Sequence, residues 1–400
     1  MRARCLLLIA AAILLAIPSP TPACPFCSAT GETLAGEVAQ ADFILYGSLS
    51  NAKRDPDEFN KGTTDLSVDL IIKDNEWLKG KKSVTISKFL QPAKKDAKQL
   101  VFFKLYNGQL DAYRGEEVPA ESKLPDYLKG AIAVRPKDSL TRLAYFFDFL
   151  ESPDLVISGD AYSEFGYAEY KEVRELADKW KSDSAKSKQL LGWLKDPNTR
   201  ATRFGLYGML LGHCGEAADA KALRALLDDP MRSYTSGLDG VVAGYIMLDA
   251  KAGWEYLLTI IADEKKDFSV RYAGLRTVRF FWESRPDIIP KAQVMAAMQA
   301  LMNQSDLADL PIEDLRKWKQ WDQVPVVLGY AAKESHNTIP IVNRAVLKFA
   351  LSALQADPKN AVAAEFVEKA RAKDPKKVEF MESLLKDEVK PAPAVPAKPK

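Results

Sequence analysis

The spacing of hydrophobic positions changes once along the chain. Between residues 41 and 136 the apolar residues alternate with polar ones, as in Leu66-Ser-Val-Asp-Leu70. This period of two buries one face of a β-strand and leaves the other in water. Beyond these strands, apolar residues recur at intervals of three and four positions, as between Leu140 and Leu150, which places them on one face of a helix. The pattern therefore predicts a β-rich part followed by an α-helical part.

The β-rich part contains five or six short candidate strands. One of them is the apolar run Ala41–Leu49, and two more flank Asn107-Gly108. An Asn-Gly pair between apolar runs predicts a β-hairpin because both turn positions favour positive φ. We expect a last strand at Gly130-Ala-Ile-Ala-Val134. So many short strands in about 95 residues predict a small β-barrel.

Helix starts in the second part carry a repeated signal, an acidic or hydroxyl residue close to a proline. The acidic or polar side chain caps free backbone N–H groups, and proline fits the first helical turn, where its missing N–H costs nothing. The intervals from 153 to 197, 197 to 230 and 230 to 267 are 44, 33 and 37 residues, a range typical of repeats built from helix pairs. Alanine and glycine on the inner face would let neighbouring helices approach closely. The signals occur at Pro153-Asp154, Asp196-Pro197, Asp229-Pro230, Asp267 and Asp357-Pro358.

Residues 194–212 resemble the HEAT-repeat family. They read Leu-Lys-Asp-Pro-Asn-Thr-Arg-Ala, followed by spaced leucines and a glycine, and the resemblance extends over roughly residues 139–386. Arg200 and Arg271 lie where such repeats usually carry an arginine that supports the neighbouring unit. The resemblance implies an α-α superhelix of the HEAT or armadillo type, whose long surface binds partners and carries out no chemistry.

The N-terminal part resembles the netrin/TIMP-like OB-fold module over roughly residues 24–136. The resemblance rests on Cys24-Pro-Phe-Cys27, on Ala41-Asp42 with Gly47, and on Trp77-Leu-Lys-Gly80. It implies an OB-like barrel, and it implies that the amine and carbonyl of a first-position Cys24 could chelate the zinc of a metalloprotease. The chain departs from TIMPs in having Cys-x-x-Cys rather than Cys-x-Cys, with no distant cysteine in the domain.

The N-terminus has the layout of a secretory signal peptide. Two arginines precede the apolar run Cys5–Ile17, and small residues follow it up to Ala23. We predict cleavage after Ala23, so that residues 1–23 are removed and the protein acts in the periplasm, in the cell envelope or outside the cell. The apolar run is shorter than the ~20 residues that a transmembrane helix needs, and no other segment predicts a span. A lipid anchor on Cys24 remains an alternative, although Thr21 is a poor match to lipoprotein processing.

Composition narrows the choice of partners. The chain has 56 basic and 54 acidic residues, and removal of two arginines with the signal peptide leaves 54 of each (56 − 2 = 54). A neutral protein has no basic excess for phosphate backbones, so we expect no nucleic-acid binding. Residues 388–400, rich in Pro, Ala and Lys, predict a disordered tail that follows the helical domain at 137–387.

The Cys24-x-x-Cys27 pair is the most specific chemical motif. It is not a c-type haem site, because Ser28 stands where that motif needs histidine. A local disulfide in an oxidising compartment is the favoured interpretation. Thiol–disulfide exchange stays open, because a helix expected at residues 32–40 would lower a thiol pKa, and so do metal and lipid roles.

No other residue pattern indicates catalysis. His213-Cys214 and His336 supply too few ligands for a metal site, and no nucleophile elbow or phosphate-binding glycine loop is present. We therefore expect no catalytic residues, no metal, no cofactor and no enzymatic activity. Among the tryptophans of the helical part (Trp254, Trp282, Trp318 and Trp321), we take Trp318 and Trp321 as candidate partner-binding residues, since exposed tryptophans often anchor interfaces.

These observations predict a multidomain β + α protein, with a small OB-like barrel at 24–136 and a HEAT-like helical domain at 137–387. The expected function is that of an exported protein-binding scaffold, whose partner is a protein or a cell-envelope component. A TIMP-like inhibitor and a Cys24/Cys27 exchange protein are the alternatives.

Overall fold

The computed structural model describes residues 24–27, 31–56, 61–90, 97–229 and 236–389. The chain divides into two compact units, Met1–Leu176 (unit 1) and Ala177–Lys400 (unit 2). The predicted signal peptide lies outside the described residues, and so does most of the predicted tail, of which only residues 388 and 389 fall within the last helix.

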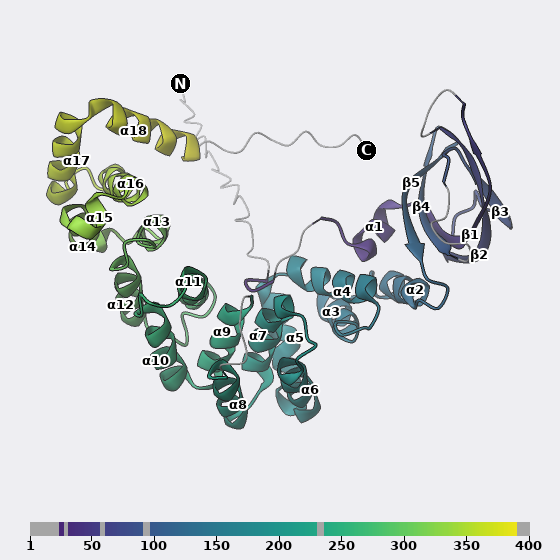
Figure 1. The fold of residues 1–400 in the computed structure, drawn as a ribbon, viewed down its shortest axis with the longest axis horizontal. Helices are drawn as coiled ribbons and strands as arrows, with labels where there is room; N and C mark the ends of the chain where they lie inside the picture. Colours follow the sequence, from purple (N-terminus) through teal and green to yellow (C-terminus); the bar gives the residue numbers. More distant parts are fainter. Residues whose placement is uncertain (1–23, 28–30, 57–60, 91–96, 230–235, 390–400) are drawn as a thin grey trace, which may run out of the picture. The chain divides into compact units, whose positions relative to one another are not determined.

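Unit 1 contains one antiparallel sheet of five strands in the order β3-β2-β1-β4-β5 (Figure 1). The Asn107-Gly108 hairpin is confirmed: both residues have positive φ, and Tyr106 pairs with Gln109 across the turn. The described strands show no pairing between β3 and β5, so the sheet is open and the closed barrel of the prediction is not shown. The strands are β1 Phe43–Arg54, β2 Gly62–Lys73, β3 Ser83–Ile86, β4 Lys98–Tyr106 and β5 Gln109–Val118.

One face of the sheet carries a compact hydrophobic cluster. The ring of Phe43 lies between those of Phe103 and Trp77, with centroids 4.7 Å and 5.6 Å away. Aliphatic side chains from all the other strands, Leu66 and Ile86 among them, complete a fully buried cluster. The central strands β1 and β4 each contain an unbroken run of four or more buried residues, so both faces of the sheet are covered there.

Helices α1 (Leu34–Gln40), α2 (Leu124–Val134), α3 (Ser139–Phe147) and α4 (Leu155–Tyr167) belong to the same unit as the sheet, and α5 (Tyr170–Lys179) follows at its end. The strand expected at Gly130–Val134 is wrong, because these residues form the second half of α2. The buried positions 124, 127, 128 and 131 of α2 have helical spacing, which the short run Ala-Ile-Ala-Val concealed.

Unit 2 is helical throughout its described residues. In it, α7 packs against α9 and α9 against α11, while α10 packs against α9, α11 and α12, so that odd- and even-numbered helices form two rows here (Figure 1). The helices are α6 Ser184–Lys195, α7 Phe204–Cys214, α8 Ala217–Leu227, α9 Leu238–Leu248, α10 Ala250–Ile261, α11 Phe268–Glu283, α12 Lys291–Met302, α13 Asp309–Lys317, α14 Val324–Gly329, α15 Glu334–Asn337, α16 Pro340–Ala356, α17 Ala361–Lys373 and α18 Pro375–Val389.

Helices α7 and α9 meet backbone to backbone at glycines. A Cβ added to Gly240 would overlap the backbone of Gly205, and a Cβ added to Gly244 would overlap the carbonyl group of Gly208. Gly205 and Gly208 are three positions apart on α7, and Gly240 and Gly244 are four positions apart on α9. In each helix the two glycines therefore lie on the side that faces the other helix. The expected role of small residues in close helix packing is therefore confirmed for this pair.

The helix-start signals have mixed outcomes. Asp154 caps α4 by accepting hydrogen bonds from the backbone N–H groups of Val156 and Ile157. Asp267 precedes α11 but makes no cap bond with its side chain. Asp357 does not cap α17, because Asn360 takes that place. Pro230 lies outside the described residues.

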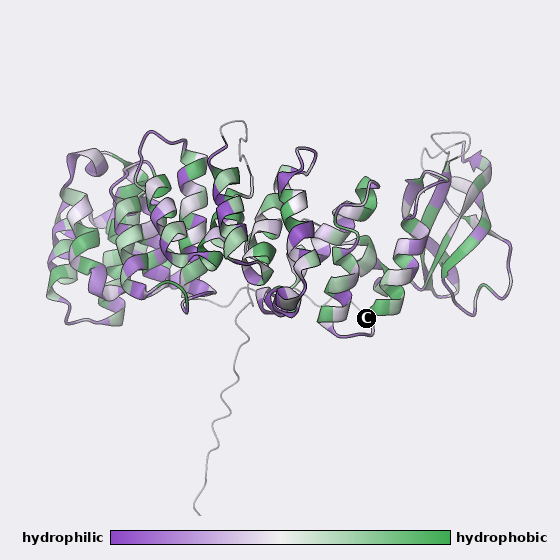
Figure 2. Cartoon of the chain, turned by 90° about the horizontal axis from the view of Figure 1, so that it is seen from below, coloured by the Kyte–Doolittle hydropathy of each residue, from purple (hydrophilic) through white to green (hydrophobic). Residues whose placement is uncertain are grey.

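Helices α7 and α9 of unit 2 are buried over almost their whole length, whereas most of the other helices have one buried and one exposed face. In Figure 2, hydrophilic and hydrophobic residues alternate along them. Within the described ranges, no helix combines the length and the apolar character that a membrane span requires.

Candidate functional site

The first described residues form a small disulfide loop. Cys24 and Cys27 are joined, with their Cα atoms 5.4 Å apart, and Cys24 is buried. The backbone N–H of Cys24 donates to the carbonyl oxygen of Ala168 at 3.0 Å, and the carbonyl oxygen of Cys24 accepts from the N–H of Cys27 at 3.2 Å. The two backbone groups that a TIMP-like inhibitor would offer to zinc are thus both engaged within unit 1. Burial of Cys24 also restricts the access that thiol exchange requires.

A buried carboxylate on α4 holds the start of α1. Asp160 accepts hydrogen bonds from the backbone N–H groups of Leu34 (2.5 Å) and Ala35 (3.2 Å) and from the hydroxyl of Tyr127 (2.8 Å). Burial raises the pKa of Asp160, and these hydrogen bonds partly offset the effect. All the oxygen contacts go to the chain itself, so Asp160 is a positioning residue for α1.

Glu164, one turn further along α4, completes this attachment. It accepts from the hydroxyl of Thr33, which also caps α1, and burial raises the pKa of Glu164. Glu164 lines a hollow of about 360 Å³ together with Arg135 and Arg142. Neither carboxylate was predicted from the sequence. Their only signal is that two acids, four positions apart, share the apolar face of α4 with Ile157 and Ala161.

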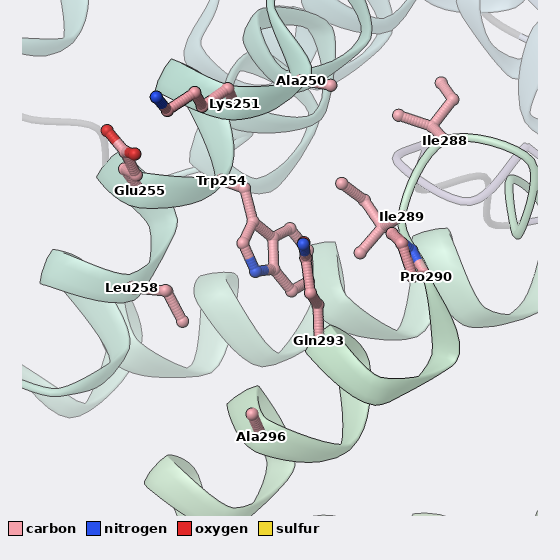
Figure 3. A pocket seen from close by; sticks show the side chains of 10 residues that line it. All are labelled: Ala250, Lys251, Trp254, Glu255, Leu258, Ile288, Ile289, Pro290, Gln293 and Ala296. Atoms are coloured by element: carbon pink, nitrogen blue, oxygen red, sulfur yellow. The ribbon is translucent and has the colours of Figure 1, made fainter.

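An apolar hollow in unit 2 lies between α10 and α12, and we call it the α10/α12 groove. Its volume is about 620 Å³. In Figure 3 the indole of Trp254 projects from α10 towards α12, with Leu258 on one side and Ile289 on the other. The indole of Trp254 also makes an edge-to-face contact with the ring of Phe281, and the two centroids are 6.1 Å apart. The full lining is Ala250, Lys251, Trp254, Glu255, Leu258, Ile288, Ile289, Pro290, Gln293 and Ala296.

The polar residues of the groove lie at its rim. Lys251 and Glu255 point away from the indole in Figure 3, and both are exposed, as is Gln293 on α12. An apolar floor surrounded by a polar rim is the usual anatomy of a site that takes an apolar side chain of a partner. Trp254 was among the tryptophans noted in the sequence, but its role depends on Ile288–Pro290, which the sequence analysis did not consider. The signal was an apolar Ile-Ile-Pro run directly before a helix.

The two predicted partner-binding residues lie in different places. Trp318 stacks on Trp282 with centroids 4.8 Å apart, and its indole N–H donates to Glu283 at 3.2 Å. Trp321 meets Phe349 edge to face and lines a separate hollow of about 370 Å³. Both tryptophans are half-buried, and neither lines the α10/α12 groove.

Ion pairs connect neighbouring helices in unit 2. Burial raises the pKa of Asp239 and Asp314, and in each case the partner arginine opposes this effect. Partly buried pairs of this kind add little net stability, because the cost of desolvating the charges offsets their attraction. The pairs are Arg276–Asp239 (2.9 Å, α11 to α9), Arg279–Asp314 (2.7 Å, α11 to α13) and Lys348–Glu313 (3.4 Å, α16 to α13).

The two arginines of the HEAT-like pattern differ. Arg271 is buried and bonds both carboxylate oxygens of Asp306, at 2.9 Å and 2.6 Å, and the amide oxygen of Gln304 at 2.6 Å. It therefore ties the start of α11 to the loop after α12. Arg200 is half-exposed, and Arg203, three residues later, is the buried one.

The remaining candidates for a chemical role, Cys214 and His336, are both buried. Burial raises the pKa of the Cys214 thiol to about 12, so it stays protonated. His336 is buried, with Nε2 2.8 Å from the carbonyl oxygen of Met302. Within the described part of the chain, no group of three or more His, Cys, Asp or Glu side chains is placed to hold a metal ion.

Comparison with known proteins assigns this chain neither to a family nor to a function. No protein-family model, curated protein or solved structure matches this chain. The HEAT-like and netrin/TIMP-like resemblances therefore stay predictions, and function has to be inferred from the geometry of the two units.

Proposed function

We propose that this protein is an exported, non-enzymatic scaffold that holds another protein, or a protein component of the cell envelope, on the helical surface of unit 2. The observation that carries the proposal is the α10/α12 groove. Its occupant is an apolar side chain of the partner, seated against the indole of Trp254. Lys251 and Glu255 at the rim provide charges of both signs for flanking polar residues of the partner.

The packing of unit 2 supports this scaffold role. Two rows of helices with close glycine contacts and interhelix ion pairs are what a HEAT-like stack would use to hold a rigid surface. A groove between rigid helices binds at a lower entropic cost than one formed by loops. The proposal also covers unit 1, whose sheet we take to belong to an OB-like barrel.

The N-terminal sequence supports export, through the charged start, the short apolar run and the small residues up to Ala23. The geometry around Cys24 gives no support to the inhibitor and exchange alternatives. Its nitrogen and carbonyl oxygen are both hydrogen-bonded, and the residue is buried. We therefore do not extend the proposal to them.

Filling the groove tests the proposal. Ala296 is exposed on α12 and lines the groove, whereas Ala292, one turn earlier on the same helix, is exposed and does not line it. Ala296→Arg places a long charged side chain over the indole, and Ala292→Arg is the matched control. Both changes are at helical surface positions, so circular dichroism and thermal unfolding should match those of the unchanged protein.

The measurement is a quantitative pull-down from envelope fractions, followed by calorimetry with the purified partner. We expect a partner retained by the unchanged protein and by Ala292→Arg, and bound at least tenfold more weakly by Ala296→Arg. Equal binding by both variants would show that the partner does not use this groove. Absence of any partner common to the unchanged protein and the control contradicts the scaffold role itself.

A further inference from the structure

The hollow of about 370 Å³ beside Trp321 is a second concave feature of unit 2, and we call it the Trp321 hollow. Its lining comes from the end of α13, from the loop that follows α13, and from α16 and α18. Helix α16 packs against both α13 and α18 (Figure 1), so the hollow has walls from three neighbouring helices. It shares no lining residue with the α10/α12 groove.

Four charged residues around the Trp321 hollow balance one another. Arg316 forms ion pairs with Glu313 and, at 2.9 Å, with Glu388. Lys348 contacts the same two carboxylates. Two cations thus face two carboxylates, and this group has no net charge.

Two further cations, Lys317 and Lys319, line the hollow without such a balance. Lys317 is 4.0 Å from Glu313, a carboxylate that Arg316 and Lys348 already share. Lys319 is exposed, and its side chain forms no ion pair with any residue that the structure describes. The hollow is therefore positively charged, and an anion complements it.

Lys319 lies at a helix end where glycine is the usual residue. The N–H of Gln320 donates to the carbonyl oxygen of Leu315 at 2.9 Å, and the N–H of Lys319 donates to that of Arg316 at 3.0 Å. These two bonds form a Schellman ending of α13, and Lys319 occupies its left-handed position with a φ of 56°. Glycine adopts this conformation without the clash that a Cβ causes, so the helix ending gives no reason for a lysine here.

Ser352 on α16 provides an unused hydrogen-bond donor. The residue lines the hollow and is only 8% exposed, and its hydroxyl oxygen has no hydrogen-bond partner in the described part of the chain. A buried hydroxyl without a partner is destabilising, because it has lost its hydrogen bonds to water. An oxygen atom of a ligand in the hollow would supply the missing acceptor.

The hollow also has an apolar wall, which includes Trp321, Ala356 and Leu385. The ring of Trp321 is held by an edge-to-face contact with Phe349, and the two centroids are 5.4 Å apart. A glutamate side chain has a carboxylate for the cations and methylene groups for this wall, whereas inorganic phosphate has only charge. The chain's own tail, residues 390–400, has three lysines and no acidic residue, so its charge does not complement the hollow.

We propose that the Trp321 hollow binds a glutamate side chain from an acidic segment of a partner protein. Its carboxylate accepts hydrogen bonds from the ammonium of Lys319 and the hydroxyl of Ser352, and its methylene groups lie against the indole of Trp321. This second site goes beyond the proposed function, because it recognises charge and lies outside the α10/α12 groove. Its failure would leave the proposed function standing.

Indole N–H signals in the NMR spectrum of the isotope-labelled full chain report on this site directly. The chain has seven tryptophans, and the signal lost in Trp321→Phe identifies the one of interest. The probes are the blocked peptides Leu-Glu-Leu-Glu-Leu and Leu-Gln-Leu-Gln-Leu, and inorganic phosphate. We expect the acidic peptide to shift the Trp321 signal with a dissociation constant between about 0.1 and 1 mM, and the glutamine peptide to bind at least tenfold more weakly. The signal of Trp254 reports separately on the α10/α12 groove.

Lys319→Gly and Ser352→Ala distinguish a role in binding from a role in folding. Glycine suits the helix ending and alanine removes an unpaired hydroxyl, so both variants should be at least as stable as the unchanged protein in thermal unfolding. Each should nevertheless bind the acidic peptide at least fivefold more weakly. Lys376→Gln is the matched control with unchanged binding, since Lys376 is an exposed lysine of α18 that does not line the hollow.

Three results would overturn the proposal. The first is a Trp321 signal that the acidic peptide leaves unchanged up to about 10 mM, or that the glutamine peptide shifts equally well. The second is displacement of the acidic peptide by an equal concentration of phosphate, which would indicate a site for any anion. The third is a loss of stability together with binding in Lys319→Gly and Ser352→Ala, which would show that these residues act in folding.

Discussion

In unit 1 the α1 segment is held by Asp160, a residue 126 positions further along the chain than Leu34. In unit 2 the main helix contacts join helices that are one to three places apart in sequence, such as α7 with α9 and α13 with α16. The sheet unit therefore depends on long-range contacts between segments far apart in sequence, and the helical unit on repeated contacts between near neighbours.

This difference determines how far the effect of a lost contact should spread. A long-range contact closes a large loop, so its loss releases a whole segment. In a stack of helices each element contacts mainly its neighbours, so a damaged contact should loosen that pair and leave more distant pairs protected. Hydrogen exchange measured segment by segment distinguishes the two behaviours.

The largest effect is expected from Asp160→Ala. The change leaves two backbone N–H groups of α1 and the hydroxyl of Tyr127 without their acceptor in a buried place. Such a loss costs about 3 kcal/mol of the free energy of unfolding. Hydrogen exchange should show lost protection in residues 31–40, more than a hundred positions from the substitution.

Asp160→Asn is the matched control, because its one remaining oxygen keeps part of the acceptor role. We expect it to lose less stability than Asp160→Ala. Unchanged protection of α1 in the alanine variant would show that the sheet unit does not depend on this long-range contact.

A smaller and more local effect is expected from Gly244→Ala in unit 2. The added Cβ overlaps the carbonyl group of Gly208, so α7 and α9 must separate, at a cost of about 2 kcal/mol. Protection should fall in α7 and α9 and stay unchanged in α16 to α18. Chemical denaturation gives the stability change, and hydrogen exchange gives its extent.

Gly192→Ala supplies the control for this experiment. Gly192 lies inside α6, and a Cβ there meets nothing within 4 Å. This variant should gain about 0.5–1 kcal/mol, because alanine loses less backbone entropy in a helix than glycine does. If the two alanine substitutions changed the free energy of unfolding equally, the close contact of α7 and α9 would not determine stability.

The parts of the fold that local signals define could be predicted from the sequence. The Asn107-Gly108 turn requires positive φ, and an apolar run flanks it on each side, so the hairpin follows from a dozen residues. The cap at Asp154 is equally local. The strand expected at Gly130–Val134 was wrong because five residues do not show the period that all eleven of α2 reveal.

The candidate site could not be predicted, because it depends on which helices become neighbours. The α10/α12 groove needs Trp254 and Ile289, 35 positions apart in the sequence (289 − 254 = 35), on facing walls. Grouping α2 to α4 with the sheet is likewise a result of packing, and the change of hydrophobic period near residue 138 carries no information about it.

The smallest effect concerns the pH dependence of one neighbour contact in unit 2. The pKa of Asp306 is lowered from its ordinary value of 3.8, mainly because Arg271 donates hydrogen bonds to its carboxylate. A carboxyl with a lowered pKa in the folded state stabilises the protein above its unfolded pKa, and this stability is lost as the pH falls through the folded value. Because Asp306 is half exposed, solvent screening limits the contribution to at most about 1 kcal/mol. We therefore expect Asp306→Asn to be less stable than the unchanged protein at pH 6, with a difference that shrinks below pH ~4. Denaturant midpoints of both proteins across this range provide the measurement, and a difference that grows as the pH falls would contradict the assigned pair.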